Sequence, residues 1–255
     1  MIKSKSKKKL SNKKKSKRKI NNKDLKKYEK KIYSQNGEDG ITLEIIKRLY
    51  KNNKKQKYYV EFGTQDATEC NTRILRDKND WNGLLMDGSN ENKSINLNKE
   101  FITKENIIDL FKKYKVPKHF ELLSIDIDFN DYYVLNQIIK NYTMDIVICE
   151  YNAYFRPYED FVVKYKSNGY WNGSNYFGAS LLAYKKLLNK YNYSLVYTEK
   201  EGVNAFFIHN DLIKNKFINV DKIFKLYNTP KYGKGPRGGH PRDKKNRKFI
   251  KSVIE

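Results

Sequence analysis

The sequence predicts an α/β fold with a mostly parallel sheet that ends in an antiparallel β-hairpin. Short continuous apolar runs alternate with segments of helical periodicity along the middle of the chain. Strands that are buried on both faces of a parallel sheet read as such runs. The last two strand candidates, 193–198 and 204–209, are separated by only five residues. Because a parallel crossover needs about a dozen residues or more, we expect these two strands to pair antiparallel.

The formal net charge of +24 is concentrated at the two ends of the 255-residue chain. Residues 1–30 hold 15 Lys/Arg and two acidic residues, and residues 214–255 hold 13 Lys/Arg and three acidic residues. These ends carry +13 and +10, which leaves +1 for residues 31–213. We therefore predict a disordered Lys-rich arm (1–30), one globular domain (31–213) and a basic C-terminal extension (214–255).

Composition also predicts where the protein resides. No run approaches the ~20 apolar residues of a membrane span, and the start of the chain has no apolar signal-peptide core. Cys70 and Cys149 are the only cysteines and lie in regular-looking segments, which favours core thiols in a reducing compartment. We expect an intracellular protein, cytoplasmic or nuclear, that is not secreted and has no transmembrane segment.

The predicted elements begin near Tyr33. The motif SQNGED (34–39) ends in two acidic residues, which the N-terminus of a helix favours, and an apolar stripe follows at helical spacing. The next strand candidates are 58–62, 83–86, 101–103, 121–127 and 145–149. The helix candidates between and after them are 71–78, 106–114, 133–139 and 179–190. Five β-α units followed by a hairpin differ from the all-parallel dinucleotide-binding fold.

Carboxylates follow four of the predicted strands, at the edge where open parallel sheets bind ligands. They are Glu61, Asp66, Asp87, Asp126, Asp128 and Glu150. A turn or helix cap explains any one of them, but it explains the recurrence at four strand ends less well. Gly63 allows close backbone approach to a ligand, and Asp87 is placed to accept both hydroxyls of a ribose. Glycine-rich dinucleotide and Walker A motifs are absent, which favours an adenosine-bearing cofactor without a pyrophosphate.

The motif order resembles that of class I S-adenosylmethionine-dependent methyltransferases, and within them the FkbM-like family. The resemblance runs from about Tyr33 to Leu212. It is carried by SQNGEDG (34–40), VEFGTQDATECNT (60–72), GLLMDGS (83–89), LSIDIDFND (123–131), ICEYNA (148–153) and YFGASLLA (176–183). It implies S-adenosylmethionine as cofactor and a Rossmann-like seven-stranded methyltransferase sheet, mostly parallel, with a C-terminal antiparallel hairpin and helices on both faces.

The resemblance also assigns cofactor-binding residues. They are Glu61, Gly63, Thr64, Asp66, Asp87, Ser89, Glu105 and Asn106. The residues after the first strand would line the methionine moiety, Asp87 would hold the ribose hydroxyls, and Glu105 or Asn106 would lie near the adenine. Two positions depart from the pattern, because Ala67 and Phe129 stand where similar sequences often have glycine.

The catalytic candidates are Asp126, Asp128 and Glu150, beside the expected methyl group. A hydroxyl acceptor must lose its proton to a general base or be activated by a metal. The oxygen ligands of these three residues and Asn152 suit Mg²⁺ or Ca²⁺. In the alternative, Asp126 contacts the cofactor or acceptor directly and Asp128 caps the following helix. No histidine shows metal-ligand spacing.

The long aromatic-rich connection 151–177 predicts an ordered lid over the acceptor site. The acceptor-pocket candidates are Asn152, Trp171, Asn172, Asn175 and Tyr176. Aromatic rings with asparagines suit a sugar or a nucleobase equally well, so they do not decide the substrate class.

Two function classes follow. One is O-methylation of a sugar or another small hydroxyl acceptor, free or on a glycan. The other is a nucleic-acid-associated protein, or a nucleic-acid methyltransferase, in which the Lys-rich tails neutralise phosphates and the α/β domain is degenerate. In this second class KKKSKRK (13–19) also matches a nuclear-localisation signal, and residues 227–248 form an extended basic segment that folds back on the domain.

Overall fold

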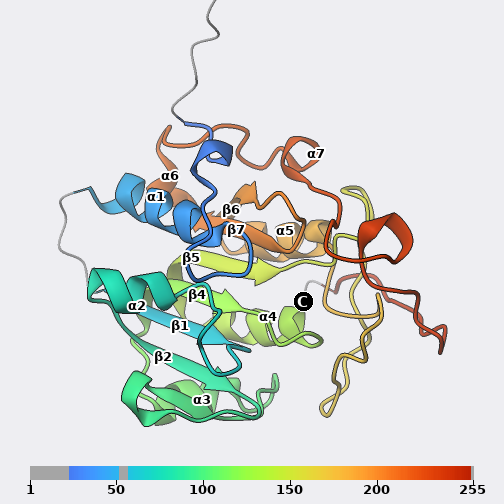
Figure 1. The fold of residues 1–255 in the computed structure, drawn as a ribbon, viewed down its shortest axis with the longest axis horizontal. Coiled ribbons are helices and arrows are strands. Elements are labelled where there is room, and N and C mark those ends of the chain that lie inside the picture. Colours follow the sequence, from blue (N-terminus) through green and yellow to red (C-terminus); the bar gives the residue numbers. More distant parts are fainter. Residues whose placement is uncertain (1–22, 52–56, 254–255) are drawn as a thin grey trace, which may run out of the picture.

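Seven strands form one sheet in the order β3-β2-β1-β4-β5-β7-β6 in the computed structural model, which describes residues 23–51 and 57–253 (Figure 1). The strands are β1 (Tyr58–Phe62), β2 (Asn82–Asp87), β3 (Leu97–Lys99), β4 (His119–Ile125), β5 (Thr143–Glu150), β6 (Tyr193–Thr198) and β7 (Asn204–His209). The first five are parallel, and β7 pairs antiparallel with both β5 and β6. The predicted α/β class, the Rossmann-like arrangement and the terminal hairpin are therefore confirmed.

Helices cover both faces of the sheet. They are α1 (Glu38–Tyr50), α2 (Arg73–Asn79), α3 (Ile107–Lys113), α4 (Asp131–Asn141), α5 (Leu181–Lys190), α6 (Asn210–Ile213) and α7 (Ile223–Leu226), with short 3-10 turns at Lys26–Tyr28, Lys93–Ile95 and Pro236–Gly238. Val60 and Phe62 of β1 belong to the core on the face that α3, α4 and α5 cover, whereas Tyr59 faces the opposite side and belongs to the core beneath α1 and α2. This alternation follows from the period of two residues along a strand.

One strand prediction is wrong. The third strand is Leu97–Lys99 rather than 101–103. Leu97 is its only buried residue, and Phe101 is 56% exposed. An edge strand pairs on one side only and can be short and polar, so a search for apolar runs passes over it.

Residues before Tyr33, the expected start of the domain, already pack on it. Leu25 is buried in the core beneath α1, and the Oε1 atom of Glu29 accepts hydrogen bonds from the Tyr197 hydroxyl and the Lys200 N–H. Residues 23–30 thus pack on the domain, which corrects their assignment to a disordered arm. The rest of that arm, including the proposed nuclear-localisation and nucleic-acid-binding run, lies outside the described residues.

The C-terminal extension packs against the domain, as expected. The hydroxyl of Tyr151 donates to the carbonyl of Asn228 at 2.8 Å. Val162, in the long loop after β5, forms a β-bridge with Ile250. Figure 1 shows this loop, in yellow, beside the red C-terminal segment. Both cysteines are buried free thiols, as predicted. Within the described ranges, no helix has the length and apolar character that a membrane crossing requires.

Candidate functional site

A cavity of about 560 Å³ opens at the carboxyl ends of β1, β2, β4 and β5. The chain order of the strands reverses between β1 and β4, and ligands of open α/β sheets bind at such a switch point. Seven of the predicted site residues line this cavity. They are Gly63, Asp87, Ser89, Asp126, Asp128, Glu150 and Trp171.

Gly63 brings the ends of β1 and β4 together. Its φ is +69°, and a Cβ built on it would lie 1.5 Å from the backbone oxygen of Asp126. The close approach that the sequence suggested is therefore made to the neighbouring strand. Ala67 also has a positive φ, of 60°. Glycine adopts this left-handed backbone without strain, whereas a residue with a Cβ loses about 1–2 kcal/mol of conformational energy there.

Glu61 shapes the loop after β1 from inside. Its carboxylate accepts hydrogen bonds from the N–H groups of Asn71 and Thr72, both at 2.8 Å, and from the Thr72 hydroxyl at 2.5 Å. Glu61 borders a smaller pocket of about 120 Å³, which shares Gly63 and Asp126 with the main cavity. Its contribution to a ligand site is therefore to hold the loop that forms the wall.

Asp87 ties the ends of β1 and β2 to each other. Its Oδ2 atom accepts from the N–H of Gln65 at 2.9 Å. Its Oδ1 atom accepts from the N–H groups of Ser89 and Asn90, at 2.8 and 3.0 Å, and from the side-chain amide of Asn90 at 2.9 Å. Three donors fill Oδ1, whereas Oδ2 accepts from Gln65 alone. Oδ2 can therefore accept one more hydrogen bond, from a ligand hydroxyl, at a point already fixed by backbone donors.

Besides Glu61, four of the predicted cofactor contacts do not border the main cavity. Thr64 is buried, and Asp66 accepts from the N–H and hydroxyl of Thr68 on the exposed side of the loop. Glu105 is bound by the Tyr165 hydroxyl, and Asn106 holds the turn before α3 by bonding the N–H of Thr103 and the carbonyl of Phe101. Short polar side chains in tight turns bond to nearby backbone and side-chain groups, as Asp66 and Asn106 do here. None of the four residues is on the cavity wall.

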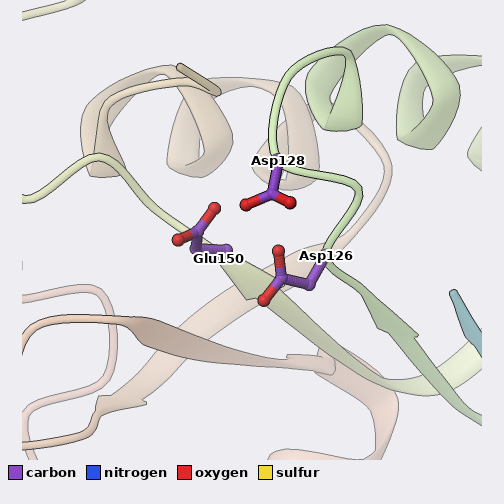
Figure 2. A group of neighbouring side chains, drawn as sticks. All are labelled: Asp126, Asp128 and Glu150. Atoms are coloured by element: carbon purple, nitrogen blue, oxygen red, sulfur yellow. The ribbon is translucent and has the colours of Figure 1, made fainter. Parts of the chain in front are cut away.

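Asp126, Asp128 and Glu150 form an acidic cluster on the cavity wall (Figure 2). One oxygen from each lies within 4.8 Å of the other two, and the carboxylates point toward one another. Asp126 and Asp128 follow β4, while Glu150 ends β5. Asp126 and Glu150 are half-buried and Asp128 is exposed to the cavity. Asp128 does not cap α4, whose preceding residue is Asn130, so the capping alternative is wrong.

The cluster holds protons more tightly than isolated carboxyl groups do. Although its oxygens reach the cavity, the surrounding protein removes water from them, and this desolvation is the largest cause that raises the pKa of Asp126 and Glu150 well above the usual range. The charges of neighbouring carboxylates raise both pKa values further. Carboxylates with raised pKa values are stronger proton acceptors than ordinary ones.

The loop after β5 forms one side of the cavity, but not through the asparagines that the sequence suggested. Asn152 is fully buried, and its amide donates to the carbonyls of Asn175 and Phe177, both at 2.9 Å. Asn172 bonds Arg247, and Asn175 bonds the backbone N–H of Asp243. These residues fold the loop instead of lining the cavity, which corrects three acceptor assignments and the metal assignment of Asn152.

Of the two aromatic acceptor candidates in this loop, one lines the cavity and the other is buried. The indole N–H of Trp171 donates to the Ser174 carbonyl at 2.7 Å, and its ring lines the cavity against His240, with ring centroids 4.5 Å apart. Tyr176 is buried between Phe129 and Phe249 and does not reach the cavity. Only Trp171 of the five predicted acceptor residues is therefore in place to contact an acceptor.

Several cavity residues were missed by the sequence analysis. Tyr232 and His240 come from the C-terminal extension, and Gln35 comes from the SQNGED motif. Burial lowers the pKa of His240, which favours the neutral imidazole. The glycines around these two residues (YGKGPRGGH, 232–240) signalled a tight loop, but not where that loop would dock.

Comparison with known proteins adds no assignment. No protein-family model matches the chain, and no curated protein matches it significantly. The function must be argued from the cavity itself.

Proposed function

We propose that the protein is an S-adenosylmethionine-dependent methyltransferase that acts on a hydroxyl group of a small molecule or glycan. The observation that carries the proposal is the position of Asp87 and the acidic cluster on one cavity at the switch point of the sheet. The parallel sheet that ends in an antiparallel hairpin is the arrangement that the motif resemblance implies.

The charges that line the cavity suit this cofactor. Among the described residues, no Lys or Arg lines the cavity, whereas five carboxylates do: Asp87, Glu100, Asp126, Asp128 and Glu150. Of these, Glu100 forms an ion pair with Lys113, which lies off the wall. This is the reverse of the whole chain, whose net charge is +24. A negative cavity repels phosphates and attracts cations. S-adenosylmethionine bears a positive sulfonium and no phosphate, so it fits where a nucleotide would be repelled.

Different residues of the cavity wall would hold the ribose and the adenine of the cofactor. Asp87 would accept one ribose hydroxyl through the free position on Oδ2. Phe101 and Ile102, which border the same part of the wall, would contact the adenine in place of Glu105 and Asn106. The cofactor supplies a methyl group activated by the sulfonium.

The acidic cluster provides the acid-base chemistry. A hydroxyl group held beside Asp126 or Glu150 would give its proton to a carboxylate as its oxygen bonds to the methyl carbon. The bond from that carbon to the sulfonium sulfur would break, and a neutral thioether would leave. The raised pKa of these groups makes each carboxylate a stronger proton acceptor than an ordinary one. Trp171 and Tyr170 form an aromatic wall near the cluster, which can position a ring-shaped acceptor and exclude water.

Binding of S-adenosylmethionine tests the proposal. We expect equilibrium dialysis with labelled cofactor to show one site on the full-length protein. In Asp87→Asn, Oδ1 can still accept from Ser89 and Asn90, but the charge is lost. Hydrogen bonds to a charged group contribute about 1.5–3 kcal/mol, so affinity should fall roughly 10- to 100-fold.

Asp109→Asn is the matched control, since Asp109 is exposed on α3 and pairs with Lys112. Its affinity should equal that of the wild type. Absence of binding by folded wild-type protein, or equal binding by Asp87→Asn, would refute the proposal.

A further inference from the structure

We propose that Asp126, Asp128 and Glu150 bind a hard divalent cation, Mg²⁺ or Ca²⁺, on the wall of the cavity. Cation binding itself does not require methyl transfer. Only the role of the cation toward an acceptor hydroxyl rests on the function proposed above.

The first support is the convergence of the three side chains. They come from two adjacent strand ends, and their oxygens already lie within 4.8 Å of one another (Figure 2). Oxygens on opposite sides of a Ca²⁺ ion are about 5 Å apart, and Mg²⁺ requires a smaller spacing that modest side-chain rotation can reach. Carboxylate oxygens are the ligands that both ions prefer.

The second support is the absence of a compensating charge from the protein. Among the described residues, no Lys or Arg side chain forms an ion pair with Asp126, Asp128 or Glu150. Glu100, another carboxylate on the cavity wall, does have such a partner, because Lys113 bonds it at 2.5 Å. Three carboxylates this close repel one another unless a proton or a cation lies between them.

The third support is independent of these three carboxylates. Asn130 lines the same cavity and is only 3% exposed. Its side-chain N–H donates to the carbonyl of Lys166 at 2.8 Å, while its Oδ1 atom has no hydrogen-bond partner among the described residues. A buried acceptor without a partner costs about 1–3 kcal/mol. An amide oxygen is also a hard ligand, either directly or through a bound water.

Asp131 adds a second unpartnered oxygen. It is fully buried, its Oδ1 atom accepts from the N–H of Ile127 at 2.6 Å, and its Oδ2 atom has no partner. Its charge is among the causes that raise the pKa of Asp126 and Glu150, so it lies near both. Outer carboxylates of this kind orient ligands and strengthen the field at a cation.

The cation gives the site a specific chemistry. With three protein carboxylates as ligands, its remaining positions would be filled by water and by the acceptor hydroxyl. A bound cation lowers the pKa of a hydroxyl that it contacts and fixes the position of its oxygen. It would also neutralise the repulsion that the cluster otherwise imposes on the fold.

Titration of the full-length protein with Mn²⁺, followed by electron paramagnetic resonance and with Mg²⁺ as competitor, tests the inference. The variants are Asp128→Asn and Glu150→Gln, and the matched control is Asp66→Asn at the exposed turn after β1. Asparagine tolerates the left-handed backbone of Asp128, whose φ is +64°, so this variant should fold. We expect one Mn²⁺ site in the wild type and in Asp66→Asn, and at least a 10-fold loss of affinity in both cluster variants.

Thermal unfolding distinguishes a cation ligand from a structural carboxylate. In EDTA, Asp128→Asn should unfold at or above the wild-type temperature, because one of three repelling charges is gone. In millimolar Mg²⁺ the order should reverse, since only the wild type gains stability from the ion.

The inference fails if folded wild type binds none of Mn²⁺, Mg²⁺ and Ca²⁺ at millimolar concentration, or if the cluster variants bind as tightly as the wild type. Cofactor binding in EDTA is measured separately. A protein that binds S-adenosylmethionine but no cation overturns only this inference. A protein that binds the cation but not S-adenosylmethionine overturns only the methyltransferase proposal.

Discussion

Replacement of Asp131 by asparagine should stabilise the protein at alkaline pH in the absence of divalent cations. The folded structure buries the Asp131 carboxylate completely, and this burial raises its pKa from 3.8 to about 7, with the charge of Asp128 as a further cause. A rise of this size corresponds to about 4 kcal/mol of lost stability for the ionised group, at about 1.36 kcal/mol per pH unit.

The sign follows from the direction of the shift. Between pH 4 and 7 the folded state binds a proton at Asp131 that the unfolded state has lost, so the stability of the wild type falls as the pH rises through this range. Below pH 4 both states are protonated, and above pH 7 both are ionised and the full loss is present. The Asp131→Asn protein lacks this group, and its stability should not fall in the same way.

Urea denaturation in EDTA at pH 4, 6 and 8 measures the effect. The asparagine Oδ1 atom keeps the bond to the N–H of Ile127, but its amide leaves a buried donor that costs about 1–3 kcal/mol. This cost is constant across pH and cancels in the comparison. We expect the difference between variant and wild type to move by about 4 kcal/mol in favour of the variant from pH 4 to pH 8. A difference that is independent of pH would refute the reasoning.

Two further substitutions test the walls of the cavity. Gly63→Ala places a side chain on a left-handed backbone and against Asp126, so it should lower the free energy of unfolding by about 3 kcal/mol in urea denaturation. Gly173→Ala also has a positive φ but open space around it, so the loss should be about 1 kcal/mol. Equal losses of stability would contradict the close approach of β1 to β4. Asn152→Ala removes two hydrogen bonds to the loop that ends at Phe177 and should cost about 2–4 kcal/mol. Limited proteolysis should then cut this loop faster than in Asn172→Ala, and equal rates would contradict the anchoring role.

The sheet could be predicted from sequence because buried strands and amphipathic helices leave strong local patterns. The bounds of β6 and β7 agree with the prediction, since both strands are short apolar runs bracketed by polar turns. β3 was misplaced because an edge strand with one buried residue leaves no such run.

The candidate site was predictable where it depends on topology alone. The carboxyl ends of parallel strands meet at one edge, so Asp87, Asp126 and Glu150 could be brought together without knowledge of any contact. Side chains within loops could not be placed in this way. Asn152 is buried by its bonds to a segment more than twenty residues later, and Asp243 binds Asn175 from the far end of the chain.

The roles of buried polar residues next to the cluster were also invisible in the sequence. Asn130 and Asp131 read as ordinary residues at the start of a helix, and Asp131 does open α4. Only the structure shows that each holds an oxygen without a hydrogen-bond partner. The C-terminal residues Tyr232 and His240 were missed for a different reason, because a basic segment carries no local signal for the surface on which it docks.

A crystal structure of the protein with S-adenosylhomocysteine, the demethylated product of the cofactor, tests the central claim most directly. We expect a ribose hydroxyl to lie within hydrogen-bond distance of Asp87 and the sulfur to face the cluster of Asp126, Asp128 and Glu150. S-adenosylhomocysteine bound outside this cavity, or no binding at a millimolar concentration of it, would contradict the claim.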